Sequence, residues 1–301
     1  MAAKIFDGNK LAHTIRAELR QRVDKLREQQ GITPGLAVLL IGNNSASRIY
    51  VNNKIRASNS VGIRSQLIEL DASVPQSTVI AELERLNQDP LIHGILVQLP
   101  LPPQLDLYKV LHKISVDKDV DGFCLYNVGG LIVGDTIFSP CTPYGVMEIL
   151  DSEGISVEGQ NVVIVGASNI VGKPLAMMMM RREATVAVCH IKTKELAQFT
   201  IHADILIVAA GVPNLILPQM VKTGAVVIDV GVNRLPDGQI VGDVDFAGVS
   251  RKASFITPVP GGVGPMTVTM LLANTITAAE HHCIRRSEFR DRDEPELVPS
   301  P

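Results

Sequence analysis

Two glycines, Gly166 and Gly172, stand between an apolar β-branched run and a helical pattern, a spacing that suits the binding of phosphate groups. The run Val162–Val165 predicts a strand, and the helical pattern begins near residues 172–174. The N-terminus of a helix offers unpaired N–H groups and a partial positive charge, so such a turn can hold a dinucleotide pyrophosphate. The usual fingerprint is G-x-G-x-x-G, whereas Ser168 replaces the second glycine here and the last glycine falls one residue late. An ordinary strand-to-helix turn therefore stays an alternative for this motif taken alone.

The next predicted strand, Thr185–His190, ends where a dinucleotide site would contact the adenosine ribose. It lies roughly 20 residues after Gly166, where an NAD-preferring site carries Asp or Glu for the ribose 2′-hydroxyl. Residues 190–194 read His-Ile-Lys-Thr-Lys and contain no carboxylate. A carboxylate would repel a 2′-phosphate, whereas a lysine and a threonine hydroxyl can receive it. The segment favours NADP, with the alternative that Lys192 and Lys194 are solvated charges at a strand end.

Several polar residues of the first half follow predicted strands, where α/β sheets bind their ligands. Tyr50 and Lys54 are four residues apart on a predicted helix, so their side chains share one face. Gln98 lies at the end of the predicted strand Ile92–Leu99, and Asp121 follows a further predicted helix. We expect these groups to meet at a cleft between two α/β domains. The alternative for the first two is a packed phenol beside a lysine whose stem lies along it.

A stiff loop, Thr257–Thr267, contains three glycines and three prolines. Such a backbone can approach a ligand closely, and Pro265 suits the start of the following helix. A rigid crossover between domains is the alternative, and a crossover at a cleft would also line it.

The elements that position these groups alternate between strand and helix, and in the second half helical patterns at Lys194–His202 and Leu217–Lys222 separate the predicted strands. Near-continuous apolar runs at Ala203–Gly211 and Ala225–Gly231 indicate strands buried on both faces, as in a parallel sheet covered by helices. We therefore expect two α/β domains flanking a cleft, the second of them a Rossmann-like doubly wound parallel sheet. The expected boundaries are 1–139 for the first domain, completed by a C-terminal helix at 266–284, and 140–265 for the second. The charged, proline-bearing segment 285–301 is expected to be a disordered tail.

In the first half, the predicted elements alternate in the same way. They are a helix at Lys10–Gln29 with Asn9 as its N-cap, a strand at Gly35–Gly42, a helix at Ser47–Val61, a strand at Arg64–Leu70, a helix at Gln76–Leu86 and a strand at Ile92–Leu99.

Composition narrows the class of protein. The chain has 301 residues, 46% of them hydrophobic and 20% charged, with a formal net charge of −3, which argues against nucleic-acid binding. The four cysteines form no C-x-x-C pair, so neither a disulfide framework nor a zinc site is indicated, and a reducing cytoplasm fits best. We expect no bound metal. The N-terminus lacks the apolar region of a secretory signal, and the longest apolar runs are too short to span a membrane.

Six motifs in this order resemble the bifunctional methylenetetrahydrofolate dehydrogenase/methenyltetrahydrofolate cyclohydrolase family, from about residue 3 to 282. They are Tyr50–Lys54, Gly94–Pro102, Lys118–Gly122, Pro140–Pro143, Gly166–Ser168 with Gly172, and Pro258–Thr267. The resemblance implies a tetrahydrofolate derivative held in the cleft and NADP bound to the second domain. Hydride would pass from the bridging methylene carbon to the nicotinamide, and water would then attack the methenyl cation to give 10-formyltetrahydrofolate. It further implies a cytoplasmic enzyme of one-carbon metabolism and a homodimer joined through the dinucleotide domain.

The resemblance also implies roles for individual residues. Lys54 would be the catalytic lysine, with Tyr50 flanking the folate and Gln98 hydrogen-bonded to Lys54. Asp121 would bind the pterin. The folate site would also be lined by Pro260, Gly261, Gly262, Val263 and Gly264. The dinucleotide contacts would be Gly166, Ala167, Ser168, Ile191, Lys192 and Val232.

Three positions depart from the family pattern. Many relatives carry Arg at the position of Ala167 and Ser or Arg at that of Ile191, to hold a 2′-phosphate, and Gly130 stands where Arg is common. NADP preference in this chain would therefore depend on His190, Lys192 or Thr193. A lysine that moves protons near neutral pH must be uncharged for part of the cycle, so we hypothesise that Lys54 assists the hydrolytic step in that form.

Two other functions share this architecture, because fold alone does not determine function. One is a different two-domain NADP dehydrogenase that acts on a small hydroxy or amino acid. The other is a non-catalytic dinucleotide sensor, which would bind nucleotide without turnover. Neither requires the set Tyr50, Lys54 and Gln98 or the loop 257–267.

Overall fold

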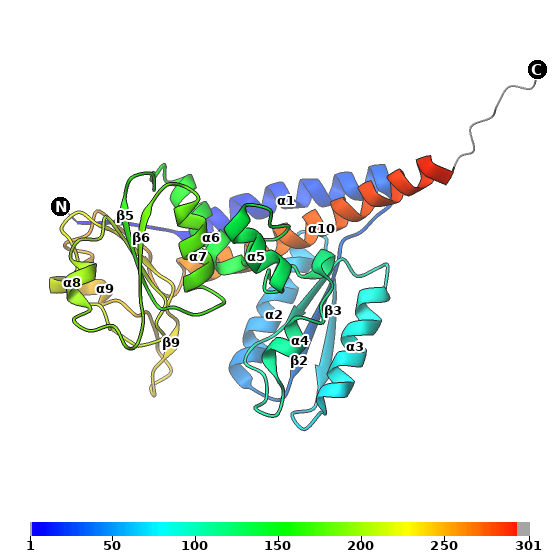
Figure 1. Ribbon diagram of the computed structural model, residues 1–301, viewed down its shortest axis with the longest axis horizontal. Helices are drawn as coiled ribbons and strands as arrows, with labels where there is room; N and C mark the ends of the chain where they lie inside the picture. The colour runs from blue at the N-terminus through cyan, green and yellow to red at the C-terminus, as the bar shows by residue number, and fades with distance from the viewer. Residues whose placement is uncertain (1, 294–301) are drawn as a thin grey trace, which may run out of the picture. The chain divides into compact units, whose positions relative to one another are not determined.

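The computed structural model describes residues 2–293, and residues 1 and 294–301 lie outside the described part. The chain divides into two compact units. The six-stranded unit comprises residues 2–16 and 121–271, and the three-stranded unit comprises residues 17–120 and 272–293. Two of the three boundaries between the units fall inside long helices, α1 (Gly8–Gln30) and α10 (Val263–Asp293), and the third lies between residues 120 and 121. Figure 1 shows both helices in one view.

The six-stranded unit is built on a wholly parallel sheet in the order β1-β11-β8-β7-β5-β6. Its strands are β1 (Lys4–Ile5), β5 (Asn161–Val165), β6 (Thr185–Cys189), β7 (Ile205–Val208), β8 (Val226–Asp229) and β11 (Phe255–Ile256). The chain runs from β5 to β6 on one side and then returns to β7 on the other. This reversal is the switch point at which doubly wound sheets bind dinucleotides. The Rossmann-like sheet expected from the apolar runs is confirmed.

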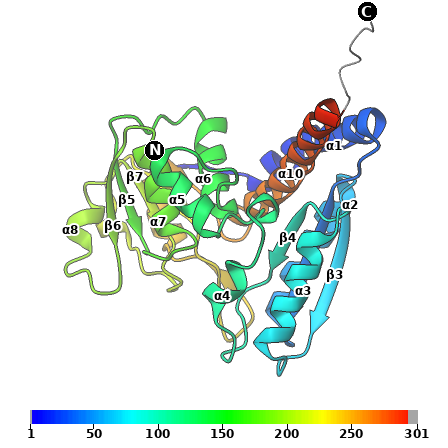
Figure 2. The ribbon, with the colours of Figure 1, turned by 45° about the vertical axis from the view of Figure 1, so that its right-hand side comes forward.

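Helices and short elements cover this sheet. Helix α7 (Gly172–Met180) packs against β5, β6 and the helix α6 (Cys141–Ser152), and α5 (Leu125–Val133) packs against α7. Figure 2 shows β5, β6 and β7 side by side with α7 next to them. The shorter elements are α8 (Ala197–Thr200), η2 (Pro218–Met220), α9 (Phe246–Val249) and an antiparallel ribbon of β9 (Asn233–Arg234) and β10 (Ile240–Val241).

The three-stranded unit has a parallel sheet in the order β3-β2-β4. Its strands are β2 (Gly35–Ile41), β3 (Arg64–Leu70) and β4 (Gly94–Val97), and every residue of β2 is buried. Its helices include α2 (Ser45–Ser60), α3 (Gln76–Gln88) and α4 (Leu107–Leu111), and the turn η1 (Val116–Lys118) follows α4. The chain passes from β2 to β3 and then returns to β4 on the far side of β2. This sheet therefore has its own switch point, between β2 and β4.

The two compact units group some segments differently from the expected domains, whose boundaries stay a prediction. Residues 2–16 group with the six-stranded unit because β1 pairs with β11 and the Phe6 ring lies 5.8 Å from that of Phe255. Residues 121–139 join the same unit, where α5 packs against α7. Helix α10 runs to Asp293, beyond the expected end at 284, so residues 285–293 of the expected tail belong to the helix. Residues 294–301 of that tail lie outside the described residues.

Two sets of local predictions were wrong: the N-cap of α1 and the lengths of two helices in the six-stranded unit. Asp7, rather than Asn9, caps α1, because its carboxylate accepts the Lys10 N–H at 3.0 Å. The helices expected at 194–202 and 217–222 are reduced to α8 and η2. Turns and irregular backbone at residues 190–196 and 209–217 take up the rest of each connection.

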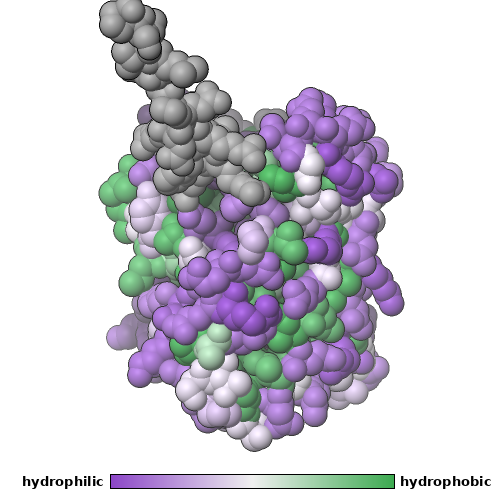
Figure 3. All heavy atoms as spheres, turned by 90° about the vertical axis from the view of Figure 1, so that its right-hand side faces the viewer, coloured by the Kyte–Doolittle hydropathy of each residue, from purple (hydrophilic) through white to green (hydrophobic). Residues whose placement is uncertain are grey.

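Within residues 2–293, no helix is long and apolar enough to cross a membrane. The face drawn in Figure 3 is mostly hydrophilic, with apolar side chains in small groups. Scattered apolar groups of this size are ordinary on protein surfaces.

Candidate active site

The lysine and glutamine singled out in the sequence meet at the switch point of the three-stranded sheet. Lys54 lies on α2, which follows β2, and Gln98 comes directly after β4. The Lys54 Nζ donates a hydrogen bond to Gln98 Oε1 at 3.0 Å. Asn44 caps α2 by accepting the Ser47 N–H at 3.0 Å, which fixes where the helix begins. The predicted contact between Lys54 and Gln98 is therefore present in the structure.

Gln98 is held by two further hydrogen bonds. Its backbone N–H donates to the Leu39 carbonyl at 2.9 Å, which extends the β2–β4 ladder. Its side-chain Nε2 donates to the Leu99 carbonyl at 2.7 Å, so Oε1 is left to face the lysine. A lysine ammonium has only donors, and an amide oxygen can accept from it without a neutralising charge. The arrangement orients Nζ and leaves its protons available for transfer.

Tyr50 lies one turn before Lys54 on the same helix and is 44% exposed. In the described part of the chain, no hydrogen bond joins its hydroxyl to Lys54 or Gln98. The contact of its ring with a folate stays a prediction.

Asp121 begins the second segment of the six-stranded unit, whereas Lys54 and Gln98 belong to the three-stranded unit. The residue after it, Gly122, has a φ of +77°, and a Cβ there would lie 2.7 Å from the Pro140 backbone nitrogen. A glycine is thus required, and it fixes the backbone beside the Asp121 carboxyl. The binding of a pterin by Asp121 stays a prediction.

The loop 258–265 is held against the start of α1. Gly8 donates its N–H to the Gly261 carbonyl at 2.9 Å, and a Cβ on Gly8 would lie 1.9 Å from the Gly262 carbonyl oxygen. Gly262 and Val263 are buried, whereas Pro260 and Gly264 are exposed. Gly261 is half-buried, so Pro260 and Gly264 are the most exposed of the five predicted folate contacts, and these contacts stay predictions.

The glycine turn after β5 is too tight for any side chain. Gly166 has a φ of +120°, and a Cβ there would lie 2.2 Å from the Ala209 carbonyl oxygen. A Cβ on Gly172 would lie 1.8 Å from the Gly166 carbonyl oxygen. Gly172 therefore performs the role of the third fingerprint glycine, close contact between helix and strand, although it falls one residue late. The turn fits a dinucleotide pyrophosphate.

Ser168 takes a different role from the glycine that it replaces. Its hydroxyl accepts the N–H groups of Val171 at 3.1 Å and Gly172 at 3.4 Å, at the start of α7. Ser168 is exposed and the neighbouring Ala167 is half-buried, so both can border a phosphate. Their contact with the dinucleotide stays a prediction.

A compact turn follows β6 and presents two side chains outward. His190 donates its N–H to Thr193 Oγ1 at 2.8 Å, and the Lys192 N–H donates to His190 Nδ1 at 3.2 Å. Ile191 is 96% exposed and Lys192 is also exposed. After β8, Val232 is 50% exposed. These side chains are exposed, and their contacts with a nucleotide stay predictions.

Two buried carboxyl groups near the ends of β7 and β8 were missed in the sequence. Asp229 is 3% exposed and Asp243 is fully buried. Burial, opposed by backbone hydrogen bonds and reinforced by the charge of Asp243, raises the pKa of Asp229 to about 7. The signal was an aspartate at the end of an apolar strand, Ala225–Gly231, where a hydrophobic side chain is usual.

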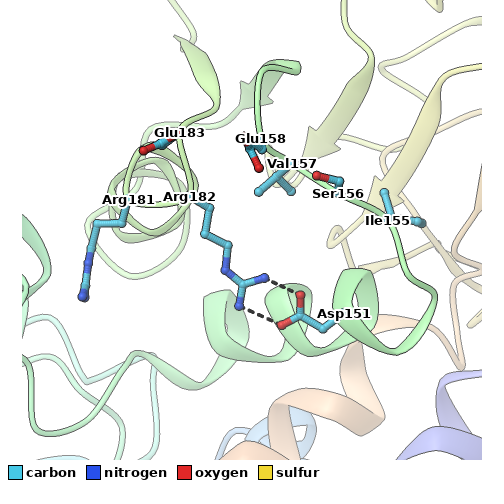
Figure 4. Close-up of a pocket in the computed structure, with 8 residues that line it drawn as sticks. All are labelled: Asp151, Ile155, Ser156, Val157, Glu158, Arg181, Arg182 and Glu183. Carbon is cyan, nitrogen blue, oxygen red and sulfur yellow. Dashed lines mark hydrogen bonds and ion pairs between the residues drawn. The ribbon is translucent and has the colours of Figure 1, made fainter.

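An open pocket in the six-stranded unit holds none of the predicted site residues. Figure 4 shows Arg182 pointing toward Asp151, with which it forms a two-pronged ion pair, while Arg181 points away. The ion pair occupies the Arg182 guanidinium, and the Arg181 guanidinium donates to the Gly134 carbonyl at 3.4 Å. Among the residues whose side chains the structure describes, 2–45 and 47–283, no group of three or more His, Cys, Asp or Glu residues is arranged to hold a metal ion.

Two family models cover most of the chain. One, described as tetrahydrofolate dehydrogenase/cyclohydrolase, catalytic domain, matches residues 6–121. The other, the NAD(P)-binding domain of the same description, matches residues 140–283. The chain belongs to the tetrahydrofolate dehydrogenase/cyclohydrolase family. The family's catalytic domain thus contains Lys54 and Gln98, and its NAD(P)-binding domain contains the glycine turn.

Relatives in this family are similar over nearly the whole chain. The bifunctional protein FolD of Nitrosospira multiformis is 56% identical over 280 residues, which cover 93% of this chain and 97% of the relative. The crystal structure of the bifunctional methylenetetrahydrofolate dehydrogenase/cyclohydrolase FolD from Campylobacter jejuni matches with a TM-score of 0.91 and 50% identity, covering 93% and 99% of the two chains. The FolD structure from Trypanosoma brucei, complexed with NADP and an inhibitor, matches with a TM-score of 0.90 and 39% identity, covering 93% and 98%.

Proposed function

We propose that the chain oxidises 5,10-methylenetetrahydrofolate to 5,10-methenyltetrahydrofolate with NADP and then hydrolyses the product to 10-formyltetrahydrofolate. The observation that carries the proposal is the Lys54–Gln98 hydrogen bond at a strand switch point, in a chain of this family. The glycine turn at Gly166 and Gly172 supports the dinucleotide half of the reaction. NADP, when bound, takes the hydride from the methylene carbon.

In the hydrolytic step, Lys54 would move a proton. Water would add through its oxygen to the methenyl carbon while one of its protons passes to the lone pair of the Lys54 Nζ. A carbon–nitrogen bond of the five-membered ring would then break, and its electron pair and that proton would go to the departing nitrogen. The remaining hydroxyl proton would be released to solvent as the carbon–oxygen bond becomes the formyl C=O. Gln98 Oε1 holds Nζ by accepting one of its hydrogens, so the nitrogen lone pair can point toward the water. Tyr50 would stack on the folate, and Asp121 would bind the pterin.

Replacing Lys54 by Met tests this role. The variant Lys54→Met should abolish hydrolysis of methenyltetrahydrofolate while folate still binds, measured by absorbance and by equilibrium binding. Lys109→Met is the matched control, because Lys109 is an exposed lysine on α4 of the same unit. Hydrolysis by Lys54→Met at the unsubstituted rate would overturn the assignment.

The complete reaction is tested with methylenetetrahydrofolate and either NADP or NAD. We expect reduced nicotinamide to form faster with NADP, without a matching build-up of methenyltetrahydrofolate. Accumulated methenyltetrahydrofolate would contradict the hydrolase activity. Nucleotide binding without any turnover would instead indicate a sensor.

We also propose that the protein is a cytoplasmic homodimer. The outer edge of β6 has no partner strand among the described residues, and an unpaired edge favours association with a second copy. A reducing compartment is supported by the cysteines, since none of the four forms a disulfide in the described part of the chain.

A further inference from the structure

Asp243 holds two segments that follow neighbouring strands. Its Oδ2 accepts the N–H groups of Ala210 at 2.6 Å and Gly211 at 2.9 Å, in the loop after β7. Its Oδ1 accepts the Val212 N–H at 3.0 Å and the Asn233 side-chain N–H at 2.8 Å, the latter at the start of β9. A single buried carboxylate therefore fixes the loop 210–212 relative to the segment after β8.

Asp229 holds the segment that carries Asp243. Its Oδ1 accepts the N–H groups of Gly231 and Asp243, both at 3.0 Å, and its Oδ2 accepts the Val244 N–H at 2.9 Å. The Asp229 N–H in turn donates to Thr257 Oγ1 at 2.8 Å. Asp229 thus links the end of β8 to residues 243 and 244.

Two glycines make room for the carboxylates. A Cβ on Gly231 would lie 2.2 Å from Asp243 Oδ1, and a Cβ on Gly242 would lie 1.9 Å from Asp229 Oδ2. Neither position can carry a side chain without displacing an aspartate. The two segments are shaped around these carboxylates.

The loops held in this way border the nucleotide turn. The Ala209 carbonyl oxygen, next to the residues that Asp243 holds, is the atom that a Gly166 Cβ would strike. On the far side of β5, the turn 190–193 after β6 is the predicted contact of the 2′-phosphate. A dinucleotide whose pyrophosphate lies at Gly166 and whose adenosine lies over β6 must extend its nicotinamide over β7 and β8.

We propose that Asp243 is a positioning residue for hydride transfer, with Asp229 holding it in place. By anchoring loop 210–212 and residues 231–233, it sets the surface on which the nicotinamide ring lies. The inference rests on the proposed dehydrogenase function. Burying two carboxyl groups costs desolvation free energy, and apolar residues would fill this space at a lower cost. This cost favours a positional role for the two carboxyl groups.

The chain's two activities allow a sharp test. Asp243→Asn keeps the size of the side chain. Its NH₂ group would face two N–H donors that in the unsubstituted chain donate to a carboxylate oxygen. We expect the dehydrogenase kcat to fall by about 10- to 100-fold, as misplacement of about 1 Å does. The rate of hydrolysis of supplied methenyltetrahydrofolate, which needs no nucleotide, should stay unchanged.

A kinetic isotope effect separates positioning from a loss of folded protein. With methylenetetrahydrofolate deuterated at the transferred position, Asp243→Asn should show a larger isotope effect than the unsubstituted chain, because hydride transfer becomes slower. Asp237→Asn is the matched control, since Asp237 is an exposed carboxylate between β9 and β10 that accepts the Gln239 N–H. Where Asp243→Asn does not fold, Asn233→Ala removes one contact to Asp243 and should shift both measurements in the same direction by less.

Three results would overturn the inference. One is an unchanged dehydrogenase kcat in Asp243→Asn. Another is an equal loss of both activities with an unchanged isotope effect, which would make the aspartate merely structural. The third is an unsubstituted chain with no dehydrogenase activity, which would overturn the proposed function together with this inference.

Discussion

At the scale of the residue, the direction in which the Gln98 amide points decides what Lys54 can do. The hydrogen bond from Gln98 Nε2 to the Leu99 carbonyl leaves Oε1 for the lysine. A glutamine held only by its backbone could present either end of its amide. The chemistry proposed for Lys54 thus depends on the Leu99 carbonyl, which contacts no substrate in the proposed mechanism.

His93 is a second residue whose surroundings set its charge. Its Nδ1 accepts the Gly35 N–H at 3.0 Å, and its ring meets that of His282 edge-on at 5.5 Å. Burial, followed by the charges of His282, Lys118 and Arg64, lowers the pKa of His93 to about 4. Between a pH of about 4 and 6.5, His93 is therefore neutral in the native state but protonated in the unfolded chain.

A pH dependence of stability follows from this shift. The contribution of a neutral His93 is complete above the unfolded pKa of about 6.5 and is lost as the pH falls toward 4, by about 3 kcal/mol in all. His93→Asn keeps an acceptor for Gly35 but cannot titrate, so its free energy of unfolding should fall less over that range. Urea denaturation at a series of pH values measures the difference. Parallel curves for both proteins would contradict the prediction.

Lys192 tests the choice between the two dinucleotides. Lys192→Glu should raise the KM for NADP much more than the KM for NAD, because only NADP carries a 2′-phosphate for the carboxylate to repel. Lys194→Glu is the comparison, because it changes a second exposed lysine two residues later. Equal effects of Lys192→Glu on both nucleotides would show that Lys192 does not contact the phosphate.

At the scale of the element, the strand–turn–helix unit depends on two glycines that touch. Gly172→Ala would place a Cβ 1.8 Å from the Gly166 carbonyl oxygen, so the turn or α7 must move. We expect a loss of stability on the order of 1–3 kcal/mol and a raised KM for NADP. Gly129→Ala is the control, since Gly129 lies on α5 with no atom within 4 Å of the added Cβ. That change should stabilise by up to about 1 kcal/mol. A normal KM for NADP in Gly172→Ala would contradict the role of the turn.

At the scale of the whole molecule, the edge of β6 is the surface that we assign to the dimer. Val188, 37% exposed on this strand, is the position to change. Val188→Lys should produce a monomer, because an inserted charge disfavours pairing at a strand edge. Ile132→Lys, at an exposed position on α5 of the same unit, should leave the dimer intact. Light scattering after size-exclusion chromatography distinguishes the two states. A dimeric Val188→Lys would place the interface elsewhere, and a monomeric unsubstituted chain would refute the dimer.

The sequence by itself determined the class of fold, the strands β2 to β8 and the glycine turn. Strands buried on both faces must be apolar along their length, so runs such as Ala203–Gly211 mark them without knowledge of their neighbours. The motif at Gly166 and Gly172 is equally local, since one turn carries both residues. Recognition of the family depended on motifs of the same short kind, which is why the two activities could be anticipated before any contact was known.

Only the tertiary structure decided how distant segments meet. Strand β1 joins β11 from the opposite end of the chain, which groups residues 2–16 with the six-stranded unit. The carboxylates of Asp229 and Asp243 share one buried site because two strand ends and the residues around Gly242 converge there. Lys54 and Gln98 are 44 residues apart, and their hydrogen bond exists only because β2 pairs directly with β4. A local sequence pattern indicates whether a residue is buried or exposed. Strand order and register depend on the packing of the entire sheet, and they determine which residues it contacts.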